Sequence, residues 1–203
     1  ASSTGILIWH NTFIAPVKPM LLATSNVHYL NNLILGQSGS PEVFAIETNT
    51  NYSSSDYNGF RPNSGATYSF EWSTPAFSMV ANFPGEAGDA FTRAPLGTRD
   101  QARLEAQARE VRRFETLGAY SETTGQDSHS ILVDYDIFMN VTPTGPDPRI
   151  IYSPQDFDFR LRSGAAAVDA GLHIPGVNSG YTGSAPDLGA YESEMALPHY
   201  GPR

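Results

Sequence analysis

The chain has 203 residues, which suits one domain, or one domain with an appended piece, and it is long enough to bury a real core. Its 12 Lys and Arg stand against 21 Asp and Glu, and the resulting net charge of −9 argues against nucleic acid as a partner, because phosphate binding needs a basic surface. The chain has no Cys, which excludes both a disulfide framework and a thiolate metal site.

A short motif centred on an asparagine recurs in the first third of the chain. Its copies occupy residues 10–15, 31–36 and 57–62. Aligned, they place Asn11, Asn32 and Asn58 in one column. A repeat of roughly 20 to 26 residues is typical of a solenoid. A fourth, more distant copy is expected at residues 136–138, where Asp136 replaces the asparagine.

A short β-rich run leads into each copy, at residues 5–9, 26–30 and 43–47. These runs are apolar or alternate with period two over about five residues, as expected of strands rather than helices. Stacking such strands in parallel buries one face of each in a shared core, so the repeat predicts an all-β fold, a parallel β-helix. The column asparagines would lie at its bends, where Asn tolerates left-handed backbone angles and its amide can bond the next turn of the coil.

A strand at Ile6-Leu7-Ile8 is expected almost at the first residue, where a β-helix needs a polar cap over its open strand edges. We therefore expect the chain to be the carboxy-terminal part of a longer solenoid. The N-terminal remainder of the same polypeptide, or a neighbouring subunit, would complete it. No apolar run approaches the length of a membrane span, so none is expected.

The middle of the chain, residues 63–130, is predicted to be an insertion into the coil. Residues 98–114 carry apolar side chains at helical spacing and predict the longer of two helices. Thr98 suits its cap, with Gln101 three residues later. Its arginine and glutamate residues are expected to pair along a solvated face.

A second, short helix is predicted to follow. Thr116 suits its cap, Leu117 and Tyr120 suit its inner face, and Gly125 suits the position just past its end. Together the two helices would form a small α-helical insertion around residues 98–125.

The terminal closing segment, residues 156–203, carries a family resemblance. It contains Asp158-Phe159-Arg160-Leu161-Arg162-Ser163-Gly164, then Val168-Asp169-Ala170-Gly171, and then Pro186-Asp187-Leu188-Gly189-Ala190-Tyr191-Glu192. These stretches resemble the terminal motif of bacterial right-handed parallel β-helix proteins, the pectate-lyase-like superfamily, with Ala165 where that group usually has Ser. Asp169 and Asp187 are expected to bond loop amides or to pair with arginine. The resemblance implies that residues 1–203 belong to one right-handed β-helix domain.

The same resemblance implies an extracellular polysaccharide as the partner and a secreted, periplasmic or cell-surface location. That fold hosts lyases, hydrolases, epimerases and non-catalytic adhesive proteins, so it leaves the reaction open. The expected function is a polysaccharide lyase or glycoside hydrolase. The alternative is a structural or carbohydrate-binding fragment whose active site lies in missing N-terminal turns of the coil. No cofactor is evident, and calcium is possible.

A lyase reaction singles out one set of residues. A base must take the proton beside a uronate carboxyl group, and a cation must neutralise that carboxylate. His28 or Lys18 could be the base and Arg61 the neutralising cation. A structural interpretation competes, because His28 could equally pack between the layers of the coil.

A hydrolase reaction singles out another set. It needs two carboxyl groups about 5 to 9.5 Å apart on either side of the glycosidic bond. Glu47 with Asp56 or Glu71 could supply them. Structural interpretations compete here as well, since Glu47 could pair with a neighbouring cation and Asp56 suits a turn before Tyr57.

Overall fold

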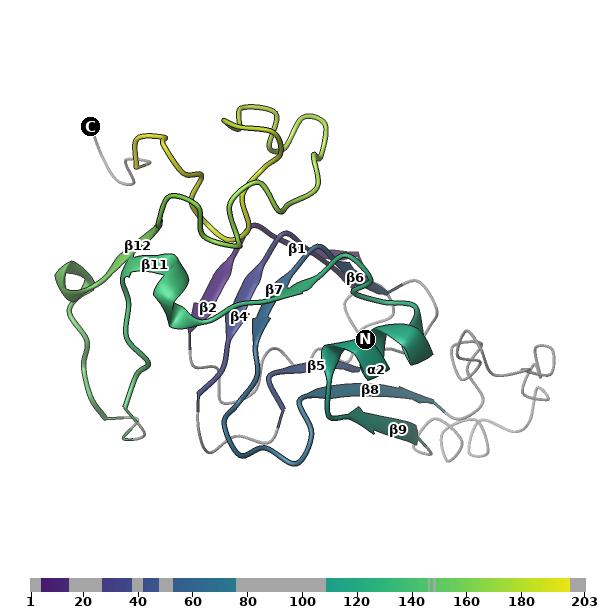
Figure 1. Cartoon of the computed structure of the whole chain (residues 1–203). Helices are drawn as coiled ribbons and strands as arrows, with labels where there is room; N and C mark the ends of the chain where they lie inside the picture. The colour runs from purple at the N-terminus through teal and green to yellow at the C-terminus, as the bar shows by residue number, and fades with distance from the viewer. Residues whose placement is uncertain are drawn as a thin grey trace.

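A computed structural model describes residues 5–14, 27–37, 42–47, 53–75, 109–145, 147 and 149–197. Within them the chain is mixed α/β, with several small parallel and mixed sheets and a single α-helix (Figure 1). The described part contains no helix that is both long and apolar enough to cross a membrane.

Two parallel sheets are built from the strands that flank the repeated asparagine. The first has the order β1 (Ile6–Trp9), β3 (Val27–Leu30) and β6 (Ser54–Asp56). The second has the order β2 (Thr12–Ile14), β4 (Leu33–Leu35), β7 (Gly59–Arg61) and β10 (Ile131–Leu132). Figure 1 shows β2, β4 and β7 side by side. Each asparagine motif therefore bends the chain from a strand of one sheet into a strand of the other.

The remaining strands of the described chain form two further sheets. In one, β5 (Phe44–Glu47) pairs in parallel with β8 (Phe70–Pro75), and β8 pairs antiparallel with β9 (Arg109–Phe114). In the other, β11 (Phe138–Asn140) pairs antiparallel with β12 (Asp158–Leu161). The helical elements of the described residues are α2 (Leu117–Thr124) and the short 3-10 helices η2 (Tyr135–Ile137) and η3 (Pro154–Asp156).

The predicted asparagine column is confirmed. Oδ1 of Asn32 accepts the backbone N–H of Asn11 at 3.0 Å, and Oδ1 of Asn58 accepts the backbone N–H of Asn32 at 3.0 Å. The side-chain amides also bond one another: Nδ2 of Asn32 donates to Oδ1 of Asn58 at 2.9 Å. Asn32 and Asn58 are fully buried, so the ladder satisfies polar groups that water cannot reach.

The left-handed backbone angles at these bends belong to the residue before each asparagine. His10, Asn31 and Tyr57 have φ values of 53°, 58° and 51°. The sharp turn is thus made one position earlier than the sequence led us to expect, and the asparagine side chain then bonds the neighbouring layer.

The prediction of a single right-handed parallel β-helix is wrong. In the described chain the parallel pairs join only β1 to β8 and β10, whereas β9 pairs antiparallel with β8 and β12 pairs antiparallel with β11. After Leu161 the described chain contains turns and bends but no further strand. The physical reason is that the three asparagine motifs stabilise only the three bends that contain them. They do not determine how the strands of the later segments pair.

Three local predictions are also wrong. The run at residues 43–47, expected to lead into the third asparagine motif, forms β5 in another sheet, and β6 takes that place. Residues 109–114, expected in the long helix, form the antiparallel strand β9, and residues 98–108 lie outside the described part. Pairing with β8 overrides the helical spacing, because it sets Arg113 against Glu71 with their side chains 2.9 Å apart. The expected fourth copy at residues 136–138 is not a parallel layer either, since β10 holds that place beside β7.

The short helix α2 is confirmed with its caps. Oγ1 of Thr116 accepts the N–H of Ala119 at 3.2 Å, and Gly125 ends the helix in the left-handed region at φ 68°. Tyr120 is fully buried on the inner side, and Leu117 packs against the same core.

Replacing Thr116 with alanine is expected to lower the free energy of unfolding by about 1 kcal/mol, because one N–H of the first helical turn loses its acceptor. Urea denaturation followed by tryptophan fluorescence measures this, with Thr116→Ser as the control that keeps the hydroxyl. Equal losses in the two variants would contradict a capping role.

The central strand β4 of the β2-β4-β7-β10 sheet is buried on both faces. One face meets a core that contains the following residues: Ile8, Val27, Tyr29, Ile34, Phe44, Phe60, Phe70, Trp72 and Tyr120. The other face meets a second core: Leu33, Leu35, Tyr135, Ile137, Phe138, Leu161 and Leu188. The uninterrupted apolar run at β4 follows from this burial on two sides.

Beyond β12, the closing segment docks onto the bends and forms no further strand in the described chain. Gly189 donates its N–H to the carbonyl of Asn31 at 2.8 Å. Asp169 accepts the N–H groups of Ser184 and Ala185, and Asp187 accepts the N–H of Asp169. The expectation that these two aspartates bond loop amides is confirmed.

Candidate acid–base site

The solvent side of the β1-β3-β6 sheet carries the candidate site. The parallel register puts residues of three strands in two rows: Leu7, His28 and Ser54, and Trp9, Leu30 and Asp56. Their chain neighbours Ile8, Tyr29 and Ser55 are buried, so strand alternation directs both rows outward. We call these six residues the outer face.

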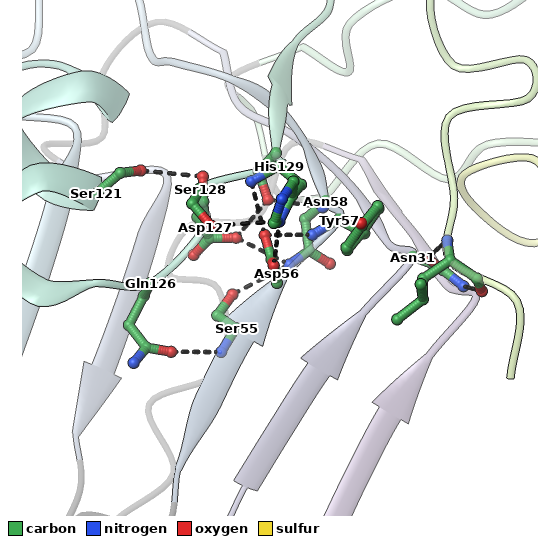
Figure 2. Close-up of polar contacts among 12 residues, drawn as sticks. Asn31, Ser55, Asp56, Tyr57, Asn58, Ser121, Gln126, Asp127, Ser128 and His129 are labelled. Carbon is green, nitrogen blue, oxygen red and sulfur yellow. Dashed lines mark hydrogen bonds and ion pairs between the residues drawn. The ribbon is translucent and has the colours of Figure 1, made fainter.

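Asp56 and His129 form an acid–base pair at the end of the outer face. Nδ1 of His129 lies 2.7 Å from Oδ2 of Asp56, and the backbone N–H of His129 donates to Oδ1 of Asp56 at 2.8 Å. The imidazole stacks on the ring of Tyr57, with ring centroids 4.7 Å apart and planes 14° apart. Figure 2 shows the three side chains gathered at the end of β6.

This geometry fixes which nitrogen of His129 is free to act. An ionised carboxylate only accepts hydrogen bonds, so Asp56 holds the proton on Nδ1 and leaves the lone pair of the neutral ring on Nε2. Ser128 Oγ lies 3.2 Å from the same Nδ1. The side chain of His129 is 59 % exposed, so its ring can meet a ligand. An imidazole oriented by a carboxylate is a general base, and the carboxylate stabilises the imidazolium that forms.

A buried aspartate anchors the loop that presents His129. Oδ1 of Asp127 accepts Nδ2 of Asn58 at 3.0 Å and the hydroxyl of Ser130 at 2.6 Å, and its backbone N–H donates to the carbonyl of Ser55 (Figure 2). Burial raises the pKa of Asp127 to about 6, because desolvation disfavours the ionised form. The asparagine column thus ends on Asp127, two residues before His129.

The structure brings together two of the residues predicted from the sequence. His28 and Asp56 both lie on the outer face, in neighbouring rows. Nδ1 of His28 lies 2.7 Å from the hydroxyl of Ser54. Asp56 also accepts the N–H of Tyr57 at 3.0 Å. This bond matches the structural alternative for Asp56, a turn before Tyr57.

The other predicted residues do not join them. Arg61 lies at the end of β7 in the second parallel sheet, where it donates to Asp134 at 2.6 Å and to the carbonyl of Gly36 at 2.8 Å. Glu71 lies on β8 and pairs with Arg113. Glu47 ends β5, and its side chain lies outside the described part, as does Lys18.

His129 was not among the predicted site residues. It lies 73 positions after Asp56 in the chain, and neither residue belongs to a motif that specifies the contact. The polar run at residues 124–130 suits a turn, but its composition does not specify a contact with Asp56.

The described residues contain no group of three or more His, Asp or Glu side chains placed to hold a metal ion, so calcium has no assigned site in this part of the chain. Comparison of the chain with family models, curated proteins and solved structures finds no match. The resemblance of the closing segment to β-helix proteins therefore stays a prediction from sequence.

Proposed function

We propose that this protein binds an extracellular polysaccharide across the outer face and that Asp56 and His129 exchange a proton with it. The observation that carries the proposal is the Asp56–His129 pair, stacked on Tyr57 at the end of a row that also contains Trp9. Amphipathic rings beside hydrogen-bonding groups suit sugars, which have both apolar faces and hydroxyl edges. A secreted or cell-surface location belongs to the same proposal.

The outer face favours an uncharged stretch of sugar over a uronate. The six residues of the face, together with Tyr57 and His129, include no lysine or arginine. Arg61, the cation that a lyase would use, is engaged with Asp134 in another sheet. Glu71, a possible second carboxylate for a hydrolase, is paired with Arg113. His129 is therefore the group on this face best placed to move a proton.

The test combines binding and turnover on the full chain. Binding to soluble polysaccharides, neutral and uronic, is measured by calorimetry, while lyase products are followed by ultraviolet absorbance and hydrolysis by reducing ends. His129→Ala is expected to weaken binding about tenfold, since it removes a hydrogen bond and half of the ring stack. If turnover occurs, His129→Ala and Asp56→Asn are expected to lower it about a hundredfold or more.

The matched control is His173→Ala, which removes another exposed histidine, one that contacts Ser179 and Tyr181 instead of the outer face. It should leave binding and turnover unchanged. Binding without turnover would favour the alternative function, a non-catalytic carbohydrate-binding protein. If no polysaccharide binds, or if His173→Ala has the same effect as His129→Ala, the proposal fails.

A further inference from the structure

A pocket of about 480 Å³ opens between η2 and the turn that follows β12. Asp134 and Asp136 line one side of it, and Arg162 and Ser163 line the turn on the other side. None of its lining residues belongs to the outer face or to the Asp56–His129 pair. Two of its lining residues, Ile137 and Arg162, adjoin β11 and β12 in the chain.

The guanidinium of Arg162 is held in place without being neutralised. Its Nε donates to the carbonyl of Phe138 at 2.5 Å and its Nη2 donates to the carbonyl of Met139 at 3.1 Å. Carbonyl groups orient a guanidinium but carry no negative charge. No carboxylate of the described residues forms an ion pair with Arg162.

The carboxylates of the pocket divide into one engaged and one available group. Asp134 accepts the guanidinium of Arg61 and the N–H of Tyr135. Asp136 is exposed, and within the described chain it makes no side-chain hydrogen bond or ion pair. The pocket therefore offers one available positive group and one available negative group.

The pocket also has apolar lining. Val133 packs against the second core and Ile137 is part of it, and both line the pocket. A ligand with a single charge would leave either Arg162 or Asp136 without a partner, whereas a ligand with both charges and an apolar portion complements all three features.

We propose that this pocket binds a small zwitterion of the α-amino-acid class, with the ligand carboxylate on Arg162, the ammonium on Asp136 and an apolar side chain over Val133 and Ile137. Arg162 suits the carboxylate because a guanidinium presents several N–H donors in one plane. The proposal concerns a second site and does not depend on the polysaccharide function.

Calorimetry on the full chain tests this with a panel of apolar α-amino acids, leucine first. Two analogues of leucine each remove one charge, 4-methylpentanoic acid lacking the ammonium and isoamylamine lacking the carboxylate. Each is expected to bind about tenfold more weakly than leucine, because one charge-assisted hydrogen bond is lost. Asp136→Asn should weaken leucine binding by a similar factor while leaving the affinity for 4-methylpentanoic acid unchanged.

Asp136→Asn is the principal variant because Asp136 supports no other group in the described chain, whereas Arg162→Gln also frees two carbonyls of β11. His129→Ala serves as the control and should leave leucine binding unchanged. Absence of binding by every amino acid of the panel at millimolar concentration would overturn the proposal. So would equal binding by leucine and its two analogues, or an unchanged affinity in Asp136→Asn.

Discussion

Replacing Asn32 with alanine is expected to lower the free energy of unfolding by about 4 kcal/mol, because two buried or half-buried backbone groups lose their partners at about 1 to 3 kcal/mol each. Oδ1 of Asn32 accepts the N–H of Asn11, and its Nδ2 donates to the carbonyl of Ile8 at 2.7 Å. Asn32 is fully buried, so water cannot replace either bond. Urea denaturation followed by fluorescence of the buried Trp72 measures the change.

The matched control is Asn11→Ala, at the first position of the same column. Asn11 is half-buried, and its side chain donates to the carbonyl of Trp9 and to Oδ1 of Asn32. Oδ1 of Asn32 keeps the backbone N–H of Asn11 in this variant. A loss of about 1 kcal/mol is expected. If Asn32→Ala cost no more than Asn11→Ala, the buried ladder would not stabilise the stacked bends.

Replacing Asp127 with asparagine is expected to remove the contribution of this carboxyl group to the pH dependence of stability between about pH 4 and 6. Burial raises the pKa of Asp127 from 3.8 to about 6, since its Oδ2 lies buried without a hydrogen-bond partner in the described chain. The folded state then binds more protons than the unfolded state in this window. The contribution of Asp127 to stability is fully present below about pH 4 and is lost as the pH rises through 6.

The expected size follows from the shift of about two pKa units, which corresponds to about 3 kcal/mol. The stability of Asp127→Asn relative to the native chain should therefore rise by about 3 kcal/mol from pH 3 to pH 7. Denaturation curves for both proteins at each pH give this difference, and the carbon-13 shift of the Asp127 carboxyl gives its pKa directly. A difference that does not vary with pH would contradict a raised pKa.

The fold shows where sequence reasoning succeeds. The asparagine column was predictable because each motif repeats the same local chemistry, a bend followed by an amide that bonds the next layer. The caps of α2 were predictable for the same reason, since Thr116 and Gly125 act within one turn of the helix that they bound. Such signals lie within a few residues of the structure that they specify.

Sequence reasoning failed where distant pairing decided the outcome. Residues 109–114 have apolar residues at helical spacing, yet they form a strand that pairs with β8. This pairing places Phe114 opposite Phe70 and Arg113 opposite Glu71. The β-helix prediction failed in the same way, because it extended the stacking of three bends to the whole chain.

Only part of the candidate site was predictable from the sequence, for the same reason. Asp56 and His28 were named from the sequence, and strand alternation places both on one face. His129 was missed because β7, β8, β9 and α2 separate it from Asp56 along the chain, so the contact depends on how all of these elements pack. No local sequence pattern indicates the contact between His129 and Asp56.

The sequence by itself determined the repeated bend, the asparagine column and the ends of the short helix, because each depends on contacts within one motif or between identical motifs. The tertiary structure alone decided which imidazole meets Asp56, which aspartate becomes buried and how the later strands pair. Those outcomes depend on the free energy of packing segments that lie far apart in the chain. The residues near any one position do not indicate that free energy.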